Sequence, residues 1–285
     1  MYQEYSIQYS AKNHYDTLVN DAYWQFLIIP EDNESQQLVS WEFSNSLHDV
    51  NQTSINGFGF KTIRVHPGQK FNDISFQASF TVIKKETNPF DFSLPHHNKA
   101  DYDKLEELNF QVDFEPFLRR TSLTRLPNTY IDMYTFDENK TIFENIQNLN
   151  GWVSEYLSFK PGVTDVDTPL EEIIEKRNGV CQDFTHLFCA VVKENKVPAR
   201  YVSGYLHQGH GYFGDSQMHA WAEVYVPDIG WVGFDPTNNL LANTNHIKVC
   251  HGKDYKDCSP LIGVVYAHGA NTTSHTVKVL SEQQQ

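Results

Sequence analysis

Polar and apolar residues alternate along the first 85 positions of the chain. Tyr5, Ile7 and Tyr9 are separated by polar residues, and the same period returns at 63–65 and over 74–82. Alternation with a period of two is typical of strands that bury one face. Turn-forming residues separate these stretches at 30–33, 56–57 and 67–68. The pattern predicts an N-terminal antiparallel β-domain, sandwich-like in form, over residues 1–85.

A helical period replaces this alternation after a less regular stretch. Residues 86–137, which include Pro89 and Pro95, are predicted to be a connecting region. The next stretch, 137–157, is predicted to be a helix even though it contains Gly151, because its apolar residues recur on one face. Those residues are Ile142, Phe143, Ile146, Leu149, Val153, Tyr156 and Leu157.

Two further helices are predicted on either side of Gly179. Thr168 to Glu171 has the form of a capping box with proline at the first helical position. This helix should run to about Arg177 and end at Gly179, where glycine tolerates a left-handed cap. The second helix should begin near Cys181, because an apolar stripe follows at a period of 3.6 residues. The stripe consists of Phe184, Leu187, Phe188, Val191 and Val192.

Three strands are predicted after the second helix. They cover 199–206, 219–226 and 231–235, and a turn at 227–230 joins the last two. Two short strand-like stretches, 264–266 and 276–280, are expected to complete the same sheet. Residues 138–285 are therefore predicted to form an α+β region, with helices packed on an antiparallel sheet.

Composition narrows the classes of function. The chain has 285 residues, is 40% hydrophobic and carries a net charge of −14, which disfavours binding to nucleic acid or to an anionic membrane. The first residues lack a basic segment followed by an apolar one, so we expect a cytoplasmic protein. Four cysteines do not make a disulfide scaffold. Cys250 and Cys258 could pair or share a metal ion, and we favour free thiols.

Cys181 is placed where a thiol can become a nucleophile. The first amides of a helix have no intrahelical partner, and the helix dipole is positive there. Both effects favour the thiolate, and the same amides could hold an oxyanion. The alternative is that Cys181 is a small buried apolar residue, as many intracellular cysteines are.

His219 and Asp235 begin and end a predicted hairpin. Two residues of an antiparallel pair share a face only if their numbers add to the same parity as directly opposed pairs. Pairing Tyr225 with Trp231 meets this condition, whereas pairing Val226 with Trp231 does not. The first register brings the side chain of Asp235 within reach of His219. We therefore predict the register that opposes Tyr225 and Trp231.

Each of these three residues has a distinct expected catalytic role. Cys181 would be the nucleophile, His219 its general base and later the acid for the leaving amine, and Asp235 the group that orients the imidazole. The Cys181 amide would be one oxyanion donor. Candidates for a second donor or for lining the site are Gln182, Trp221 and Tyr205.

Metal chemistry is a weaker alternative. His207, His210 and His219 could bind a metal for hydrolysis, but no carboxylate or further histidine follows at helical spacing. His96 and His97 are adjacent, and adjacent residues of a regular element rarely face one ion. We expect no metal and no other cofactor.

Four segments carry a resemblance to a known family. Residues 179–186, 198–205, 219–221 and 233–237 are similar to the transglutaminase-like superfamily, and 161–169 and 252–263 resemble its bacterial members with an N-terminal β-domain. The resemblance implies a papain-like α+β core with a cysteine helix packed on an antiparallel sheet. It also implies that Cys181, His219 and Asp235 form a catalytic triad.

The resemblance further implies thiol-dependent chemistry at amide bonds through an acyl-enzyme. We expect a cysteine protease, amidase or transglutaminase with a peptide or protein substrate, and favour hydrolysis because water is always available. The alternative is a catalytically silent module that binds peptides or proteins on the same fold.

Overall fold

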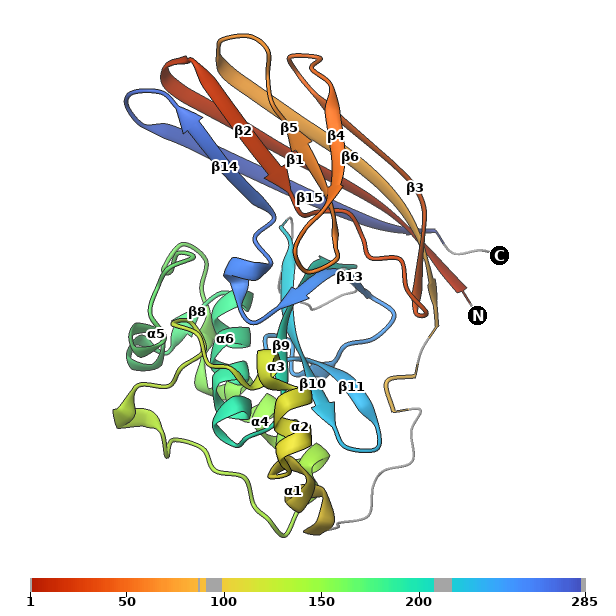
Figure 1. Ribbon diagram of the computed structural model, residues 1–285, viewed down its shortest axis with the longest axis vertical. Coiled ribbons are helices and arrows are strands. Elements are labelled where there is room, and N and C mark those ends of the chain that lie inside the picture. Colours follow the sequence, from red (N-terminus) through yellow and green to blue (C-terminus); the bar gives the residue numbers. More distant parts are fainter. Residues whose placement is uncertain (1, 87, 91–98, 208–216, 283–285) are drawn as a thin grey trace.

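The computed structural model describes residues 2–86, 88–90, 99–207 and 217–282. Its two parts are a β-sandwich, at the top of Figure 1, and an α+β half below it. None of the described helices is long and apolar enough to cross a membrane. The mixed α+β class with antiparallel sheets agrees with the prediction.

The β-sandwich consists of two four-stranded sheets. One has the strand order β15-β1-β6-β3 and the other β14-β2-β5-β4. The strands are β1 (Tyr2–Val19), β2 (Asp21–Phe26), β3 (Gln36–Asn45), β4 (Asn51–Ile55), β5 (Lys61–Val65), β6 (Phe71–Lys85), β14 (Leu261–Tyr266) and β15 (Asn271–Glu282). The predicted turns at 56–57 and 67–68 lie between β4, β5 and β6.

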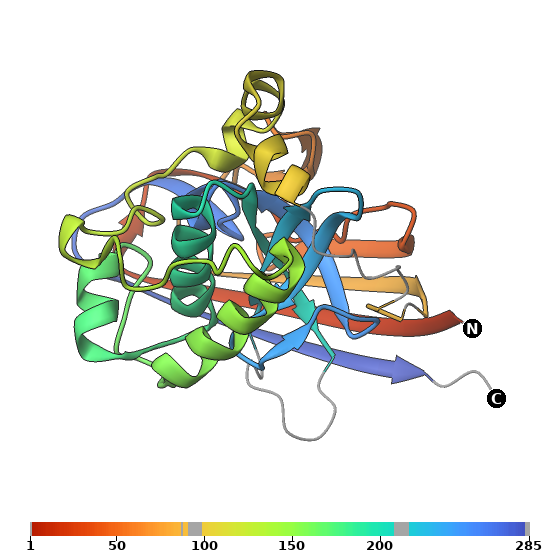
Figure 2. The ribbon, with the colours of Figure 1, turned by 90° about the horizontal axis from the view of Figure 1, so that it is seen from below.

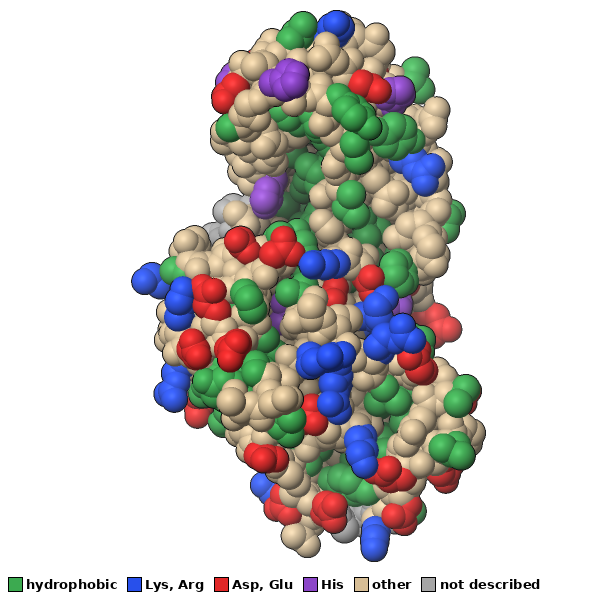
Figure 3. Space-filling view, turned by 60° about the vertical axis from the view of Figure 1, so that its left-hand side comes forward, with side chains coloured by type: hydrophobic (Ala, Val, Ile, Leu, Met, Phe, Trp, Pro, Cys, Tyr) green, Lys and Arg blue, Asp and Glu red, His purple; other side chains and the backbone are tan. Residues whose placement is uncertain are grey.

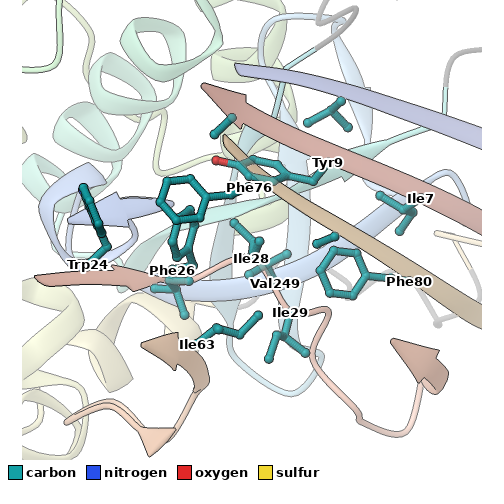
Figure 4. Packing of buried hydrophobic residues seen from close by; sticks show 14 of the residues in the cluster. Ile7, Tyr9, Trp24, Phe26, Ile28, Ile29, Ile63, Phe76, Phe80 and Val249 are labelled. Atoms are coloured by element: carbon teal, nitrogen blue, oxygen red, sulfur yellow. The ribbon is translucent and has the colours of Figure 1, made fainter. Parts of the chain in front are cut away.

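The alternation that predicted these strands also forms the hydrophobic core of the sandwich. Tyr5, Ile7 and Tyr9 are buried on one face of β1. Rings from the two sheets meet between them: the ring of Phe76 on β6 lies 4.7 Å from Phe26 and 5.3 Å from Trp24, both on β2. Figure 4 shows these side chains in one cluster. Aromatic contacts of this kind hold the two sheets together.

The last two strands correct a prediction. Residues 264–266 and 276–280 were expected to complete the sheet that carries His219, but β14 pairs with β2 and β15 pairs with β1 over twelve residue pairs. The C-terminal segment thus returns to the β-sandwich, and Figure 1 shows it beside the N-terminal strands. The physical reason is that the unpaired edges of β1 and β2 offer long ladders of main-chain donors and acceptors.

The α+β half contains a five-stranded antiparallel sheet of order β12-β11-β10-β9-β13. Its strands are β9 (Ala199–Leu206), β10 (His219–Val226), β11 (Gly230–Asp235), β12 (Leu240–Leu241) and β13 (His246–Gly252). The three strands predicted between 199 and 235 are all present. A two-stranded parallel pair, β7 (Ser158–Phe159) and β8 (Asn178–Gly179), lies outside this sheet.

Helices cover this sheet. The long helices α4 (Ile142–Tyr156) and α6 (Cys181–Glu194) and the shorter α5 (Leu170–Lys176) share one hydrophobic core with the sheet. Figure 2 shows them in green on one side of the molecule. The connecting region contributes the short helices α1 (Lys99–Leu105), α2 (Leu108–Asp113) and α3 (Glu115–Leu118). Single 3₁₀ turns lie at Asn128–Tyr130 and Tyr255–Asp257.

The helix ends differ in detail from the prediction. The Thr168 side chain does not cap α5; its hydroxyl bonds to Asp165, and Pro169 stands at the N-cap. The left-handed residue after α5 is Arg177, with φ of 51°, and not Gly179. Gly179 is needed for another reason: a Cβ there would lie 2.5 Å from the Asp183 carboxylate.

Candidate active site

Cys181 is the first residue of α6, as predicted, and its side chain is half-buried. The N-cap residue Val180 cannot accept a hydrogen bond through its side chain. The carboxylate of Asp183 does so instead, because its Oδ2 accepts from the Val180 amide at 2.7 Å and from the Thr164 hydroxyl at 2.6 Å. This carboxylate fixes the turn that presents Cys181 at the end of the helix.

The hairpin of β10 and β11 has the predicted register. Tyr225 lies opposite Trp231, and Val226 lies opposite Gly230. The register puts His219 and Asp235 on one face, and His219 Nε2 lies 2.7 Å from Asp235 Oδ2. Both side chains are fully buried. A buried hydrogen bond between a histidine and a carboxylate holds the ring in one orientation.

The second ring nitrogen of His219, Nδ1, is available to form a further hydrogen bond. Asp235 can only accept, so the proton on Nε2 is donated to it, and Nδ1 has no hydrogen-bonding partner among the described residues. Burial disfavours the imidazolium, but the charge and hydrogen bond of Asp235, together with the nearby Cys181 thiol, outweigh it and raise the pKa of His219 to about 10. Nδ1 can therefore exchange a proton with the thiol.

A second histidine contacts the same carboxylate. His246, the first residue of β13, has its Nε2 3.1 Å from Asp235 Oδ2. Its Nδ1 accepts from the Asn243 amide at 3.2 Å, so the neutral ring carries its proton on Nε2 and donates it to Asp235. The sequence does not point to His246, because only the pairing of β13 with β9 brings it to Asp235.

Asp235 accepts three more hydrogen bonds from the residues that follow it. Its Oδ1 accepts from the Thr237 and Asn238 amides, and its Oδ2 from the Asn238 side chain at 2.8 Å. Burial of the carboxylate favours its neutral form, but His219 and then His246 outweigh this and hold the pKa of Asp235 well below its usual range. Asp235 is therefore a fixed negative charge behind His219.

The structure separates the three candidates for lining the site. Gln182 lines the pocket beside Cys181, and its side chain donates to the Asp165 carbonyl. Trp221 packs behind the histidines, with its ring 6.3 Å from His219 and 5.2 Å from His246, and is outside the pocket lining. Tyr205 corrects the prediction: its hydroxyl donates to the Ile28 carbonyl at 2.6 Å, because its side chain packs in the core of the β-sandwich.

The pocket that contains Cys181 and His219 has a volume of about 490 Å³. It lies between the α+β half and the β-sandwich, and strands β1, β2, β14 and β15 form its far wall. Figure 3 shows the surface hollowed between these two parts, with hydrophobic side chains in the hollow. The volume is in the range of pockets that bind small molecules or a few side chains of a peptide.

The alternatives from the sequence can be placed as well. None of the four cysteines forms a disulfide, so Cys250 and Cys258 are not paired. The ring of His207 lies 5.4 Å from that of Tyr5. His96, His97 and His210 lie outside the described residues.

The ligand atoms of His219, Asp235 and His246 lie within 4.8 Å of one another, as they would around a metal ion. However, the Nε2 atoms of His219 and His246 lie at hydrogen-bond distance, 2.7 and 3.1 Å, from the same Asp235 Oδ2. Ligands of a tetrahedral zinc ion would stand about 3.3 Å apart. The arrangement therefore fits shared protons better than a bound ion.

Comparisons with known proteins identify what the chain is similar to. The family model of the transglutaminase-like superfamily matches residues 131–236. An uncharacterized protein of Mycobacterium tuberculosis is 33% identical over 147 residues, which are 48% of this chain and 47% of the relative. The match thus spans about half the length of that relative. A protein-glutamine gamma-glutamyltransferase of Pseudomonas aeruginosa is 31% identical over 86 residues, which are 28% of this chain and 13% of that protein.

The fold also has a solved counterpart. The structure of a "putative cysteine protease" from Cytophaga hutchinsonii superposes with a TM-score of 0.77 over 100% of this chain and 92% of that chain, at 17% sequence identity. At this identity the likeness concerns the fold. The counterpart therefore extends over the β-sandwich as well as the α+β half. Residues 131–236 thus match the transglutaminase-like superfamily, within a fold that the solved counterpart shares over the whole chain.

Proposed function

We propose that the protein is a cysteine-nucleophile enzyme that acts on amide bonds through an acyl-enzyme. The observation that carries the proposal is the buried His219–Asp235 hydrogen bond, which leaves Nδ1 of His219 open beside Cys181. Because its pKa is raised to about 10, the imidazole takes up the thiol proton and stays protonated near neutral pH. The resulting imidazolium then lies between the thiolate and the Asp235 carboxylate.

The reaction follows from these positions. The Cys181 thiolate attacks the carbonyl carbon of the substrate, and the negative charge on the carbonyl oxygen is held by main-chain amides at the start of α6. His219 Nδ1–H then gives its proton to the departing amine as the C–N bond breaks. Water or a second amine gives a proton back to His219 as it attacks the thioester, which releases the acyl product and restores the thiol.

Water is the favoured acceptor, because it is always present and none of the described lining residues identifies an amine site. The Pseudomonas relative is named for transfer of a glutamyl group, so transfer to an amine is the second possibility. A peptide or protein substrate, a cytoplasmic location and the second oxyanion donor stay predictions. The competing function is a peptide-binding module without turnover. The open Nδ1 of His219 beside Cys181 argues against it, because binding alone needs no such pair.

Trapping the acyl-enzyme tests the proposal. Incubation with p-nitrophenyl acetate should add one acetyl group to Cys181, detected by intact and peptide mass spectrometry. The adduct should be absent in Cys181→Ala and should form and decay more slowly in His219→Ala. A matched control is Cys189→Ala, because Cys189 is fully buried within α6. Acetylation of Cys181 that is equally fast with and without His219 would support the binding module instead.

A further inference from the structure

The pocket beside Cys181 has a second wall that the reaction does not use. This wall is built by the β-sandwich, from alternating residues of β1 and β15, one residue of β2 and part of β14. Its residues are Tyr9, Asn13, Tyr15, Trp24, Leu261, Gly263, Val265, Asn271, Thr273 and His275. They come from both ends of the chain, so the wall exists only because β14 and β15 return to the sandwich.

The aromatic part of the wall is firmly held. Trp24 packs edge-on against Phe76, with ring centres 5.3 Å apart, and tilts against Phe71 at 5.7 Å. Gly263 allows β14 to approach the indole, because a Cβ there would lie 2.5 Å from Trp24 Cδ1. Tyr15 is fixed in the same way by Phe71, at 6.0 Å. Aromatic rings held in place by packing bind an apolar group at little entropic cost.

The charges of the lining restrict the ligand. None of the described residues that line the pocket is lysine or arginine. Asp165 is the lining carboxylate, and it is exposed and already accepts from the Asp167 amide and the Thr168 hydroxyl. His219 also lines the pocket, but it is already paired with Asp235, so a carboxylate or phosphate of a ligand would lack a free counter-ion, which is costly away from water. The pocket therefore favours an uncharged group.

One buried side-chain amide in the wall has an oxygen that accepts no hydrogen bond from the described residues. Asn13 is 4% exposed, and its Nδ2 donates to the Tyr15 hydroxyl at 3.2 Å. Its Oδ1 has no hydrogen-bonding partner among the described residues. An unsatisfied buried carbonyl is destabilising, and an N–H group brought into this end of the pocket would relieve it. Peptide amides supply such donors.

We propose that this wall is a specificity site for an uncharged aromatic or large apolar side chain of a peptide substrate, next to the amide that reacts with Cys181. The inference rests on the proposed function. It gives the β-sandwich a role in recognition, since the acceptor Asn13 and the aromatic side chains lie on the sandwich and the thiol lies on α6. Anionic peptides should be poor ligands.

Three affinity labels with one reactive group test the proposal: chloroacetamide, 2-chloro-N-(2-phenylethyl)acetamide and N-chloroacetyl-aspartate. Each alkylates a thiolate with loss of chloride. Rates at Cys181, measured by peptide mass spectrometry, are expressed relative to chloroacetamide. The phenyl label should react about tenfold faster or more, since apolar pockets discriminate between side chains to this extent. The aspartyl label should react more slowly than chloroacetamide.

Neighbouring threonines on β15 provide a matched pair of variants. Thr273 lines the pocket, whereas Thr272 faces away from it, and both are exposed, so neither change threatens folding. Thr273→Trp should fill the site and abolish the preference for the phenyl label over chloroacetamide. Thr272→Trp should keep the preference.

Two results would overturn the proposal: no preference for the phenyl label in the parent, or the same preference in both variants. Failure of the proposed function is recognised separately. In that case the rate for chloroacetamide itself would not depend on His219. The three labels therefore distinguish loss of recognition from loss of thiol activation.

Discussion

Asp235 is the residue on which the site depends most. It accepts hydrogen bonds from two histidines, one asparagine side chain and two main-chain amides. His219 and His246 share its Oδ2, so they compete for the same negative charge. The neutral ring of His246 therefore moderates the proton affinity that Asp235 gives to His219.

This competition predicts an effect of His246 on the pH profile. In His246→Leu, Asp235 loses one donor and its charge acts more strongly on His219. The pKa of His219 should then rise further, by roughly half a unit to one unit. His246→Gln keeps an N–H donor and should stay near the parent. Nuclear magnetic resonance of the His219 ring against pH measures this directly.

A purely structural role for His246 makes a different prediction. Both variants would then lower the free energy of unfolding but leave the titration of His219 unchanged. A fall in the pKa of His219 in His246→Leu would also contradict the account, because it would mean that His246 strengthens the bond between His219 and Asp235.

At the scale of elements, strands β9, β10 and β13 are joined by buried charges as well as by their ladders. Glu223 on β10 lies 2.5 Å from Arg200 on β9 and 2.7 Å from Lys248 on β13. Burial disfavours the Glu223 carboxylate, but Lys248 and then Arg200 outweigh this and lower its pKa to about 2. The three strands therefore depend on this carboxylate being ionised.

The sign of the pH dependence follows from the lowered pKa. An unfolded chain binds the Glu223 proton near pH 4.5, whereas the folded protein does so only near pH 2. The stabilisation is complete above about pH 4.5 and is lost as the pH falls toward 2. Urea unfolding from pH 6 to 2 should therefore show a steeper loss of stability in the parent than in Glu223→Gln. Parallel curves would contradict the assignment.

The same strands show how much the sequence can predict. The even sum of the residue numbers 219 and 235 was enough to predict the register that opposes Tyr225 and Trp231. A shift of the pairing by one residue would move the side chains of one strand to the other face of the sheet. The apolar stripe was enough to place α6. Local patterns could not place β15, whose partner β1 lies more than 250 positions away. They could not assign His246 for the same reason: its contact with Asp235 depends on pairing between β13 and β9.

At the scale of the whole molecule, hydrogen bonds join the β-sandwich to the α+β half. Tyr205 donates to Ile28, and Gln36 both donates to and accepts from the main chain of Lys248. Lys84 of β6 donates to the carbonyls of Asn243 and His246, next to the histidine that contacts Asp235. The sandwich therefore helps to hold the residues around Asp235 in place.

Removal of the Tyr205 hydroxyl tests whether the β-sandwich and the α+β half are coupled in unfolding. Tyr205→Phe keeps the buried ring but leaves the Ile28 carbonyl without its donor, which should cost about 1–2 kcal/mol of unfolding free energy. Denaturation followed by far-ultraviolet circular dichroism and by tryptophan fluorescence should still give one transition. Tyr23→Phe is the matched control, because Tyr23 is 41% exposed, and it should change stability little. Separate transitions for the two parts in the parent would contradict the coupling.

The most direct test of the central claim is the rate at which iodoacetamide alkylates Cys181, measured against pH in the parent and in His219→Ala. Alkylation of an ordinary thiol falls off below about pH 8.5. If His219 and Cys181 share a proton, rapid alkylation should extend to lower pH in the parent than in the variant. Identical profiles in the two proteins would mean that His219 does not activate Cys181.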